Sequence, residues 1–206
     1  MTKQKRAARE RENPTVNGHA ATELMLIRHA PALHGGRLCG RMDVPADCSD
    51  TPRIAALRDR IGRPDRILVS PALRCRQTAG ALWPDLGEPQ TDATLWEQDF
   101  GHWEGMAFAD LPDLGPMPPD DLAKHRPPGG ESFADLCTRI APVLSSAQGG
   151  RVAIVAHAGV VRAGLALALG SVPAALGFEV APLSLTRMTP LGDGRWSVGT
   201  VNWVAA

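Results

Sequence analysis

The chain has 206 residues, a length typical of one sizeable α/β domain and short for two. It is 44% hydrophobic and 21% charged, which is the composition of a soluble globular protein and excludes a fibrous or membrane protein. Its 22 Lys and Arg residues balance 22 Asp and Glu residues, so no overall field would draw it to nucleic acid or to a lipid surface, and any anion site must be local.

The first residues contain no apolar run long enough for a signal peptide or a membrane helix, so we expect a cytoplasmic protein. Residues 1–12 carry five basic and two acidic groups and no hydrophobic pattern. We predict a disordered basic tail over 1–22 and a single domain over 23–206. A nucleic-acid-binding arm is the alternative, and the absence of aromatic residues and further basic clusters disfavours it.

The cysteines predict neither a disulfide framework nor a metal site. The four of them are scattered, form no CxxC pair and lack the spacing of a zinc site; they are Cys39, Cys48, Cys75 and Cys137. We therefore expect reduced thiols, no metal and no cofactor.

The first half of the chain alternates short apolar strands with helices. Residues 24–27 (LMLI) predict a buried strand, and residues 51–62 (TPRIAALRDRIG) predict a helix that ends at Gly62. Residues 66–70 (RILVS) predict a second buried strand, and residues 71–83 a helix with proline in its first turn. The order is strand, helix, strand, helix.

The second half begins with a proline-rich stretch. We interpret residues 110–130 as a long loop or irregular lid that contains a short helix. A helix over 132–146, a strand over 151–156 (RVAIVA) and a helix over 159–170 follow, and residues 178–203 predict one or two strands joined by the turn LGDGR.

This alternation predicts an α/β fold, a three-layer α/β/α sandwich with an open, mostly parallel sheet. Ligands bind such sheets at the carboxyl ends of the strands. His29 and His157 each come just past a predicted core strand, in LIRHA and IVAHA. If the two strands are parallel neighbours, both imidazoles lie at one rim. A histidine that only bonds a nearby carbonyl is the alternative for each alone.

Two arginines and an acid suit chemistry at that rim. Arg28 precedes His29, and its permanently charged fork fits a phosphate or carboxylate, with a salt bridge to a loop acid as the alternative. Arg74 lies near the positive end of its helix and faces the same rim, whereas Arg76 points away toward solvent. Glu97 follows Leu95 and Trp96, and partial desolvation favours its protonated form as a general acid.

The other carboxylates of that segment, Asp99 and Glu104, we expect to form turn or solvent hydrogen bonds. Two histidines, two arginines and one acid together suggest phosphoryl transfer through a histidine.

Four ordered blocks resemble the histidine phosphatase superfamily, the phosphoglycerate-mutase-like enzymes. LIRHA resembles its Arg-His-Gly signature, SPALRCRQTA its Ser-Pro-x-x-Arg-x-x-Gln-Thr-Ala block, LWEQDFGHWEG its Leu-x-Glu-x-x-Phe-Gly-x-Trp-Glu-Gly pattern, and VAHAGVVR its late His-Gly-Gly block. Ala30 and Ala158 stand where the family has glycine, and we expect their methyl groups to narrow the approach to phosphate slightly.

The resemblance implies roles for five residues. His29 is the nucleophile that becomes phosphorylated, Arg28, Arg74 and His157 bind the phosphoryl oxygens, and Glu97 takes the proton-donor position. The family's Glu-Thr-x-x-Asn continuation is replaced by PALHGG, so contacts assigned to that threonine and asparagine are not carried over.

Softer features resemble the α-ribazole phosphatase branch. HAPALHGGRLCGRMDVP and the block PPGGES are similar to that branch, which implies substrate or phosphate contacts from Gly40 and Arg41. The implied function is hydrolysis of a small phosphorylated metabolite, α-ribazole 5′-phosphate in cobalamin synthesis, with no nucleic-acid or membrane partner. Trp83, Trp96, Trp103 and Phe108 offer a stacking surface for its ring, with a place in the core as the alternative.

Three alternatives stay open: a broad-specificity phosphatase, a phosphoglycerate mutase, and a silent phospho-ligand or protein-binding module on the same fold. The short proline-rich middle segment disfavours the mutase, because the resembling mutases carry a longer basic insertion there. Intact His29, Glu97 and His157 disfavour the silent module.

Overall fold

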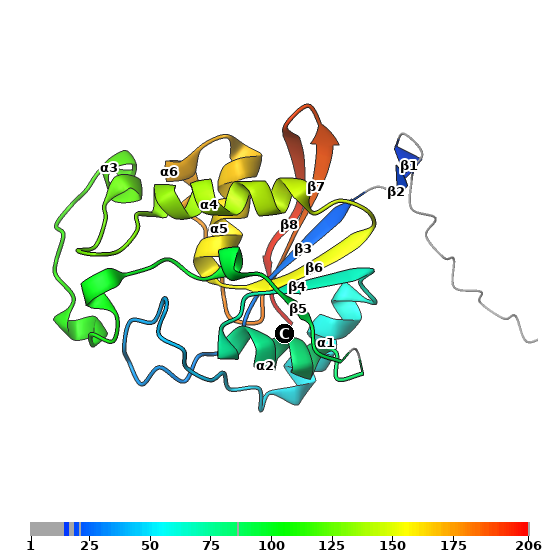
Figure 1. The fold of residues 1–206 in the computed structure, drawn as a ribbon, viewed down its shortest axis with the longest axis horizontal. Coiled ribbons are helices and arrows are strands. Elements are labelled where there is room, and N and C mark those ends of the chain that lie inside the picture. The colour runs from blue at the N-terminus through cyan, green and yellow to red at the C-terminus, as the bar shows by residue number, and fades with distance from the viewer. Residues whose placement is uncertain (1–14, 17–18, 21, 86, 206) are drawn as a thin grey trace, which may run out of the picture.

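A six-stranded sheet forms the centre of the computed structural model, which describes residues 15–16, 19–20, 22–85 and 87–205 (Figure 1). The strand order is β5-β4-β6-β3-β7-β8. Four strands run parallel: β3 (Glu23–Arg28), β4 (Arg66–Val69), β5 (Gln90–Thr91) and β6 (Arg151–Ala156). The last two, β7 (Leu185–Gly192) and β8 (Arg195–Trp203), form an antiparallel hairpin beside β3. The predicted open, mostly parallel sheet is confirmed.

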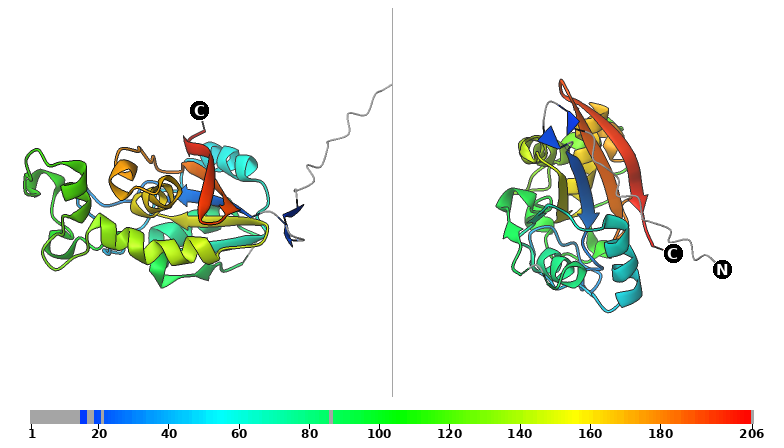
Figure 2. Two further views of the ribbon diagram at one scale, coloured as in Figure 1. Left: turned by 90° about the horizontal axis from the view of Figure 1, so that it is seen from above. Right: turned by 90° about the vertical axis from the view of Figure 1, so that its right-hand side faces the viewer.

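Helices cover both faces of this sheet (Figures 1 and 2). One face carries α4 (Phe133–Ser146), α5 (Ala158–Leu169) and α6 (Val172–Ala175), and the other carries α1 (Thr51–Ile61) and α2 (Leu73–Leu82). The predicted α/β/α sandwich is therefore confirmed.

The core strands are apolar on both faces because each face needs its own hydrophobic cluster. In β3, Leu24 and Leu26 pack with the α4 and α5 side, whereas Met25 and Ile27 pack with the α1 and α2 side. All four side chains are at most 1% exposed. A central strand buried in this way holds its carboxyl end in a fixed position.

Helix α2 begins later than the sequence predicts. Pro71 lies outside it, Ala72 is its N-cap, and its first helical residue is Leu73. The prediction of a proline in the first turn is therefore wrong. At the observed start of the helix, the backbone N–H of Leu73 donates to the carboxylate of Asp43, which lies in a distant loop, at 2.6 Å. Strand β5 and helix α6 were not predicted, since two and four residues are too few to show a period.

The middle of the chain is mostly irregular. It contains three 3₁₀ turns, η1 (Ala93–Leu95), η2 (Gly101–Trp103) and η3 (Phe108–Asp110), followed by α3 (Pro119–Lys124). The short helix expected within 110–130 is thus present, and α3 packs beside α4 and α6. The lid role of this stretch stays a prediction.

Four residues of the predicted tail are described as paired strands. Strand β1 (Thr15–Val16) pairs antiparallel with β2 (His19–Ala20). The rest of the predicted tail, residues 1–14, 17, 18 and 21, lies outside the described residues. Within the described part of the chain, no helix combines the length and apolar character needed to cross a membrane.

Candidate active site

The two histidines follow neighbouring parallel strands. Arg28 at the end of β3 is in register with Ala156 at the end of β6, so His29 and His157 are the next residues of each strand. The backbone N–H of His29 donates to the carbonyl of Ala156 at 2.9 Å, and the two imidazole centroids lie 5.2 Å apart. The prediction that both imidazoles share one rim is confirmed.

His29 is held as a neutral ring with one free lone pair. Its Nδ1 lies 2.6 Å from the Ala30 carbonyl, which can only accept, so the proton is on Nδ1 and Nε2 keeps its lone pair. Burial, opposed by the Ala30 hydrogen bond and reinforced by the charges of Arg74 and Arg28, lowers the pKa of His29 to about 3. A neutral imidazole with a free Nε2 is a nucleophile.

His157 is fully buried and fixed on three sides. Its Nε2 lies 2.8 Å from the Ser70 hydroxyl, the Cys75 sulfur is 3.5 Å away, and the Trp96 ring stacks parallel to it at 6.4 Å. Burial and then the charge of Arg74 lower the pKa of His157 well below its ordinary value. Its imidazole can therefore act as a hydrogen-bond donor through a neutral tautomer rather than as a cation.

Arg28 has an unused donor at the strand end. Its Nη1 donates to the carbonyl of Val180 at 2.6 Å. Its Nε is buried and has no hydrogen-bond partner among the described residues. A buried guanidinium N–H without a partner carries a free-energy cost that an anion would remove.

Arg74 is the second residue of α2 and is 1% exposed. Its guanidinium donates to the carbonyls of Gly40 at 2.8 Å and Met42 at 3.1 Å. Of the neighbouring charges, that of Arg74 has the largest lowering effect on the pKa of both histidines. Arg76 is exposed, as predicted.

Loop 40–42, which binds Arg74, is itself held by one carboxylate. The backbone N–H groups of Gly40, Arg41 and Met42 all donate to Glu104, and so does that of Phe100. These bonds are 2.8–3.2 Å long. The turn bonding expected of Glu104 is present, and it also fixes a second, distant loop.

The hydrogen-bond partners of Gly40 differ from the phosphate contact predicted for it. Its N–H is taken by Glu104 and its carbonyl by Arg74. A Cβ at this position would lie 1.9 Å from the Gln98 carbonyl oxygen, so glycine allows the loop to pack against residues 97–104. The prediction is corrected: Gly40 supports Arg74 instead of offering a free N–H.

Arg41 lies beside the site rather than being fixed within it. Its guanidinium is 5.7 Å above the Trp96 ring and 3.8 Å from the Glu131 carboxylate, and its side chain is 36% exposed. Its phosphate role stays a prediction.

Glu97 is half-buried beside the start of α5. Its Oε1 accepts the N–H of Gln98 at 3.0 Å, and its Oε2 accepts the N–H of Gly159 at 3.2 Å. Gly159 follows His157 by two residues, so the acid and the second imidazole share one helix start. The structure thus brings Glu97 to the same strand end as the two histidines.

Three residues that support the site were not assigned a role from the sequence, although they stand in the blocks SPALRCRQTA and VAHAGVVR. Ser70 bonds His157, and Gly159 bonds Glu97. Thr78 accepts from the N–H of Ala30 at 2.9 Å and donates to the carbonyl of Arg74 at 2.7 Å. Position in a motif was their only signal, because their partners are distant in sequence.

Ala30, which replaces a family glycine, is wholly buried in the core cluster on the α1 and α2 side. Its methyl group therefore adds to the packing of that cluster, contrary to the expected narrowing of the phosphate approach.

Of the four aromatic residues expected to form a stacking surface, Trp83 is 8% exposed and belongs to the core. Trp103 stacks on His125, and Phe108, 51% exposed, meets His34 edge to face.

All four cysteines are free thiols. Among the described residues, no three His, Cys, Asp or Glu side chains are grouped to hold a metal ion.

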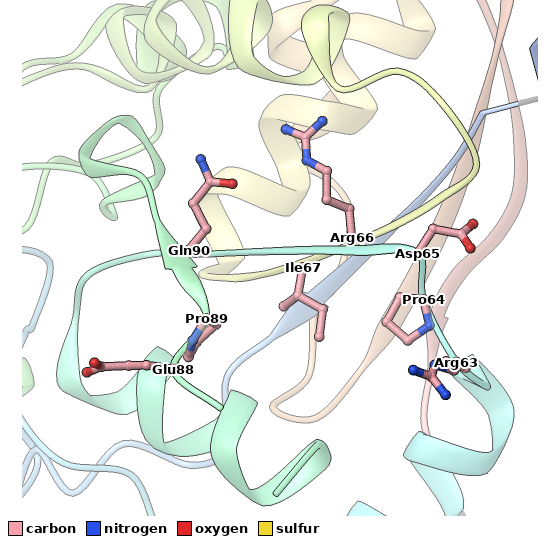
Figure 3. A pocket seen from close by; sticks show the side chains of 8 residues that line it. All are labelled: Arg63, Pro64, Asp65, Arg66, Ile67, Glu88, Pro89 and Gln90. Carbon is pink, nitrogen blue, oxygen red and sulfur yellow. The ribbon is translucent and has the colours of Figure 1, made fainter. Parts of the chain in front are cut away.

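A surface pocket lies away from these residues, at the amino ends of β4 and β5 (Figure 3). Figure 3 shows Arg66 and Gln90 projecting from one face of the sheet there and Ile67 from the other. Because the strands are parallel, this end is opposite the end that carries His29 and His157. We therefore assign the candidate site to the carboxyl ends.

Several known proteins are similar to this chain. A 6-phosphofructo-2-kinase/fructose-2,6-bisphosphatase of Caenorhabditis elegans is 31% identical in an alignment 179 residues long that covers 81% of this chain and 38% of that protein. The chain spans 38–58% of the length of the curated relatives it matches.

Two solved structures share the fold. A mycobacterial glucosyl-3-phosphoglycerate phosphatase superposes with a TM-score of 0.75 at 23% identity, covering 88% of this chain and 99% of the other. The α-ribazole phosphatase of Shigella flexneri gives 0.74 at 22% identity, covering 88% and 96%. The family model of the histidine phosphatase superfamily (branch 1) matches residues 24–204. The chain therefore belongs to the histidine phosphatase superfamily.

Proposed function

We propose that this protein is a phosphomonoester hydrolase that works through a covalent phosphohistidine at His29. The observation that carries the proposal is the pair of imidazoles 5.2 Å apart at the ends of β3 and β6, of which His29 keeps a free Nε2. Two imidazoles this close together can reach the same phosphoryl group at the rim, with one to attack it and the other to donate to its oxygens.

In the first step, Nε2 of His29 attacks phosphorus in line with the ester oxygen. The N–P bond forms, the P–O bond to the leaving group breaks, and Glu97 gives its proton to the departing alkoxide. Arg28, Arg74 and a donor tautomer of His157 stabilise the charge on the equatorial oxygens. The alcohol then leaves.

In the second step, Glu97, now a carboxylate, takes a proton from water as the water attacks phosphorus. The N–P bond breaks, inorganic phosphate leaves, and His29 regains its free lone pair. Arginine side chains supply the positive charge that a metal ion supplies in other phosphoryl-transfer sites, so we expect activity to survive a chelator.

For the substrate we propose α-ribazole 5′-phosphate. The resemblance of residues 29–45 and of PPGGES to that branch supports it, as does the similar fold of the Shigella flexneri enzyme. The equal similarity to a glucosyl-3-phosphoglycerate phosphatase makes a sugar-acid phosphate the first competitor.

The test is a phosphatase screen over α-ribazole 5′-phosphate, sugar phosphates, 3-phosphoglycerate and glucosyl-3-phosphoglycerate, with His29→Ala as the control. We expect release of inorganic phosphate, an acid-labile phosphoenzyme in the wild type, and neither in the variant. Turnover by His29→Ala would overturn the mechanism. Transfer between the hydroxyls of phosphoglycerate would identify a mutase, and binding of phosphate without turnover would identify a silent module.

A further inference from the structure

Arg139 on α4 ties down the segment that carries Glu97. Its guanidinium donates to the carbonyls of Thr94, of Trp96 at 3.1 Å and of Glu97 at 3.4 Å. One side chain therefore bonds three carbonyls within four residues. None of its bonds reaches the Glu97 carboxylate, so its action on the acid is through the backbone.

Glu131 pairs with Arg139, and we call these two side chains the clasp. Its two oxygens accept from Nε and Nη2 of Arg139 in a bidentate pair, which fixes the plane of the guanidinium. The same carboxylate accepts the backbone N–H of Asp99 at 3.0 Å. The pair thus holds the chain on both sides of Glu97, and its side chains are only 20% and 18% exposed.

The clasp is anchored to regular structure. Glu131 and Ser132 precede α4, and Ser132 caps that helix in a capping box with Asp135. Arg139 follows two turns later on α4, and α4 packs along α5, whose start binds Glu97 through Gly159. Two neighbouring helices therefore determine where the acid stands relative to His157.

We propose that Arg139, together with Glu131, is a positioning residue for the general acid Glu97. This inference rests on the proposed function. It gives a part in the reaction to the end of the PPGGES block, which the substrate assignment left without a role. Misplacing a proton donor by about 1 Å costs up to about 100-fold in rate, whereas binding of the phosphoryl group is unaffected.

The test compares Arg139→Gln on two substrates, an alkyl phosphate and p-nitrophenyl phosphate. An alkoxide needs a proton to leave, whereas p-nitrophenolate leaves without one. We expect kcat/KM on the alkyl phosphate, which reports the steps up to formation of the phosphoenzyme, to fall 30- to 100-fold, roughly the lower end of what a general acid contributes, with kcat/KM on p-nitrophenyl phosphate within about threefold of wild type. The second step is common to both substrates and also uses Glu97 as base, so kcat does not separate them.

Three further single variants and one double variant make the result specific. Glu97→Gln should show the same leaving-group signature, and Arg139→Gln in that background should cost no more than about threefold further, because the two residues act as one unit. Arg126→Ala removes an exposed pair with Asp135 next to the same segment and should leave both substrates unaffected. Arg139→Lys keeps the charge and should recover part of the lost rate, and it serves for the measurement if the glutamine variant does not fold.

An equal loss of kcat/KM on both substrates in Arg139→Gln would mean a structural role and overturn the proposal. So would additive losses in the double variant. If Glu97→Gln itself lacks the leaving-group signature, the acid assignment of the proposed function fails, which is a different outcome from failure of the clasp alone.

Discussion

The phosphate-facing half of the site and the acid-bearing half are built in different ways. His29, Arg28 and His157 occupy the ends of two paired strands, and Arg74 sits in the first turn of a helix. Glu97 lies in an irregular stretch between two 3₁₀ turns. Main-chain pairing positions the first group, and side chains from elsewhere position the second.

Because of this difference, the two halves should fail separately. Loss of Arg28, Arg74 or His157 removes stabilisation of the phosphoryl charge for every substrate. Loss of a residue that holds the segment of Glu97 slows the first step only for those leaving groups that need a proton.

The largest effect is expected for Arg74→Ala. The change removes a buried charge next to both histidines and leaves the carbonyls of Gly40 and Met42 without a donor. We expect kcat/KM to fall about 10³-fold on alkyl and p-nitrophenyl phosphates alike, as for loss of a transition-state donor. Steady-state kinetics on both substrates check this, and a loss restricted to alkyl phosphates would contradict it.

A smaller and selective effect is expected for Gly159→Ala. The new Cβ would lie 2.2 Å from Oε1 of Glu97 and 2.7 Å from a methyl of Leu136, so the acid must move. The value of kcat/KM for alkyl phosphates should fall about 30-fold, with that for p-nitrophenyl phosphate nearly unchanged.

Gly164→Ala on the same helix is the matched control. Its Cβ would crowd Leu26 at 2.6 Å in the core, away from Glu97. We expect it to lower the melting temperature without changing the ratio of the two activities. A shift of that ratio in the control would count against the explanation for Gly159.

The buried histidines predict a stability that depends on pH. Their pKa values are lowered in the folded protein, to about 3 for His29, so below pH 6.5 the unfolded chain binds protons that the folded chain does not. The free energy of unfolding should therefore drop as pH falls from 6.5 toward 3, by at most about 1.4 kcal/mol per pH unit for each histidine.

Urea unfolding of wild type and His29→Asn at pH 7 and pH 4.5 measures this dependence. The variant should lose less stability than the wild type over that interval, because one suppressed protonation is gone. An equal change in unfolding free energy between the two pH values in wild type and variant would contradict a buried neutral His29.

The smallest effect is expected for Ala30→Gly, which restores the family residue. The methyl group is fully buried in the core cluster, and glycine also increases the freedom of the unfolded chain, so we expect a loss of about 1 kcal/mol in unfolding free energy. Activity should stay within about twofold. A marked gain in rate would mean that the methyl group obstructs the substrate after all.

The sequence was sufficient to predict the sheet, its flanking helices and the phosphate-facing group of Arg28, His29, Arg74 and His157. LMLI and VAIVA are continuous apolar runs, as expected of strands covered on both faces, and the pairing of these two strands brings His29 and His157 together. Arg74 was predictable because it stands near a helix start. The late start of α2 was not, since its cap, Asp43, comes from a loop 30 residues earlier.

The supports of Glu97 were beyond sequence reasoning. Arg139 and Glu131 are 42 and 34 positions away from it, and nothing in a local pattern shows that a helical arginine turns toward a loop instead of solvent. Gly40 was assigned a phosphate contact because the block around it resembles the α-ribazole phosphatase branch. Its contact with the carbonyl of Gln98 depends on how two loops pack, which no period encodes.

The irregular stretch from Gly105 to Pro118 is largely exposed and shares no hydrogen bond with His29, Arg74 or His157. Loops of this kind accept insertions and substitutions more readily than strand ends do. If this stretch is the predicted lid, exchanging it for the corresponding stretch of another superfamily member should change substrate preference and leave the chemical step intact.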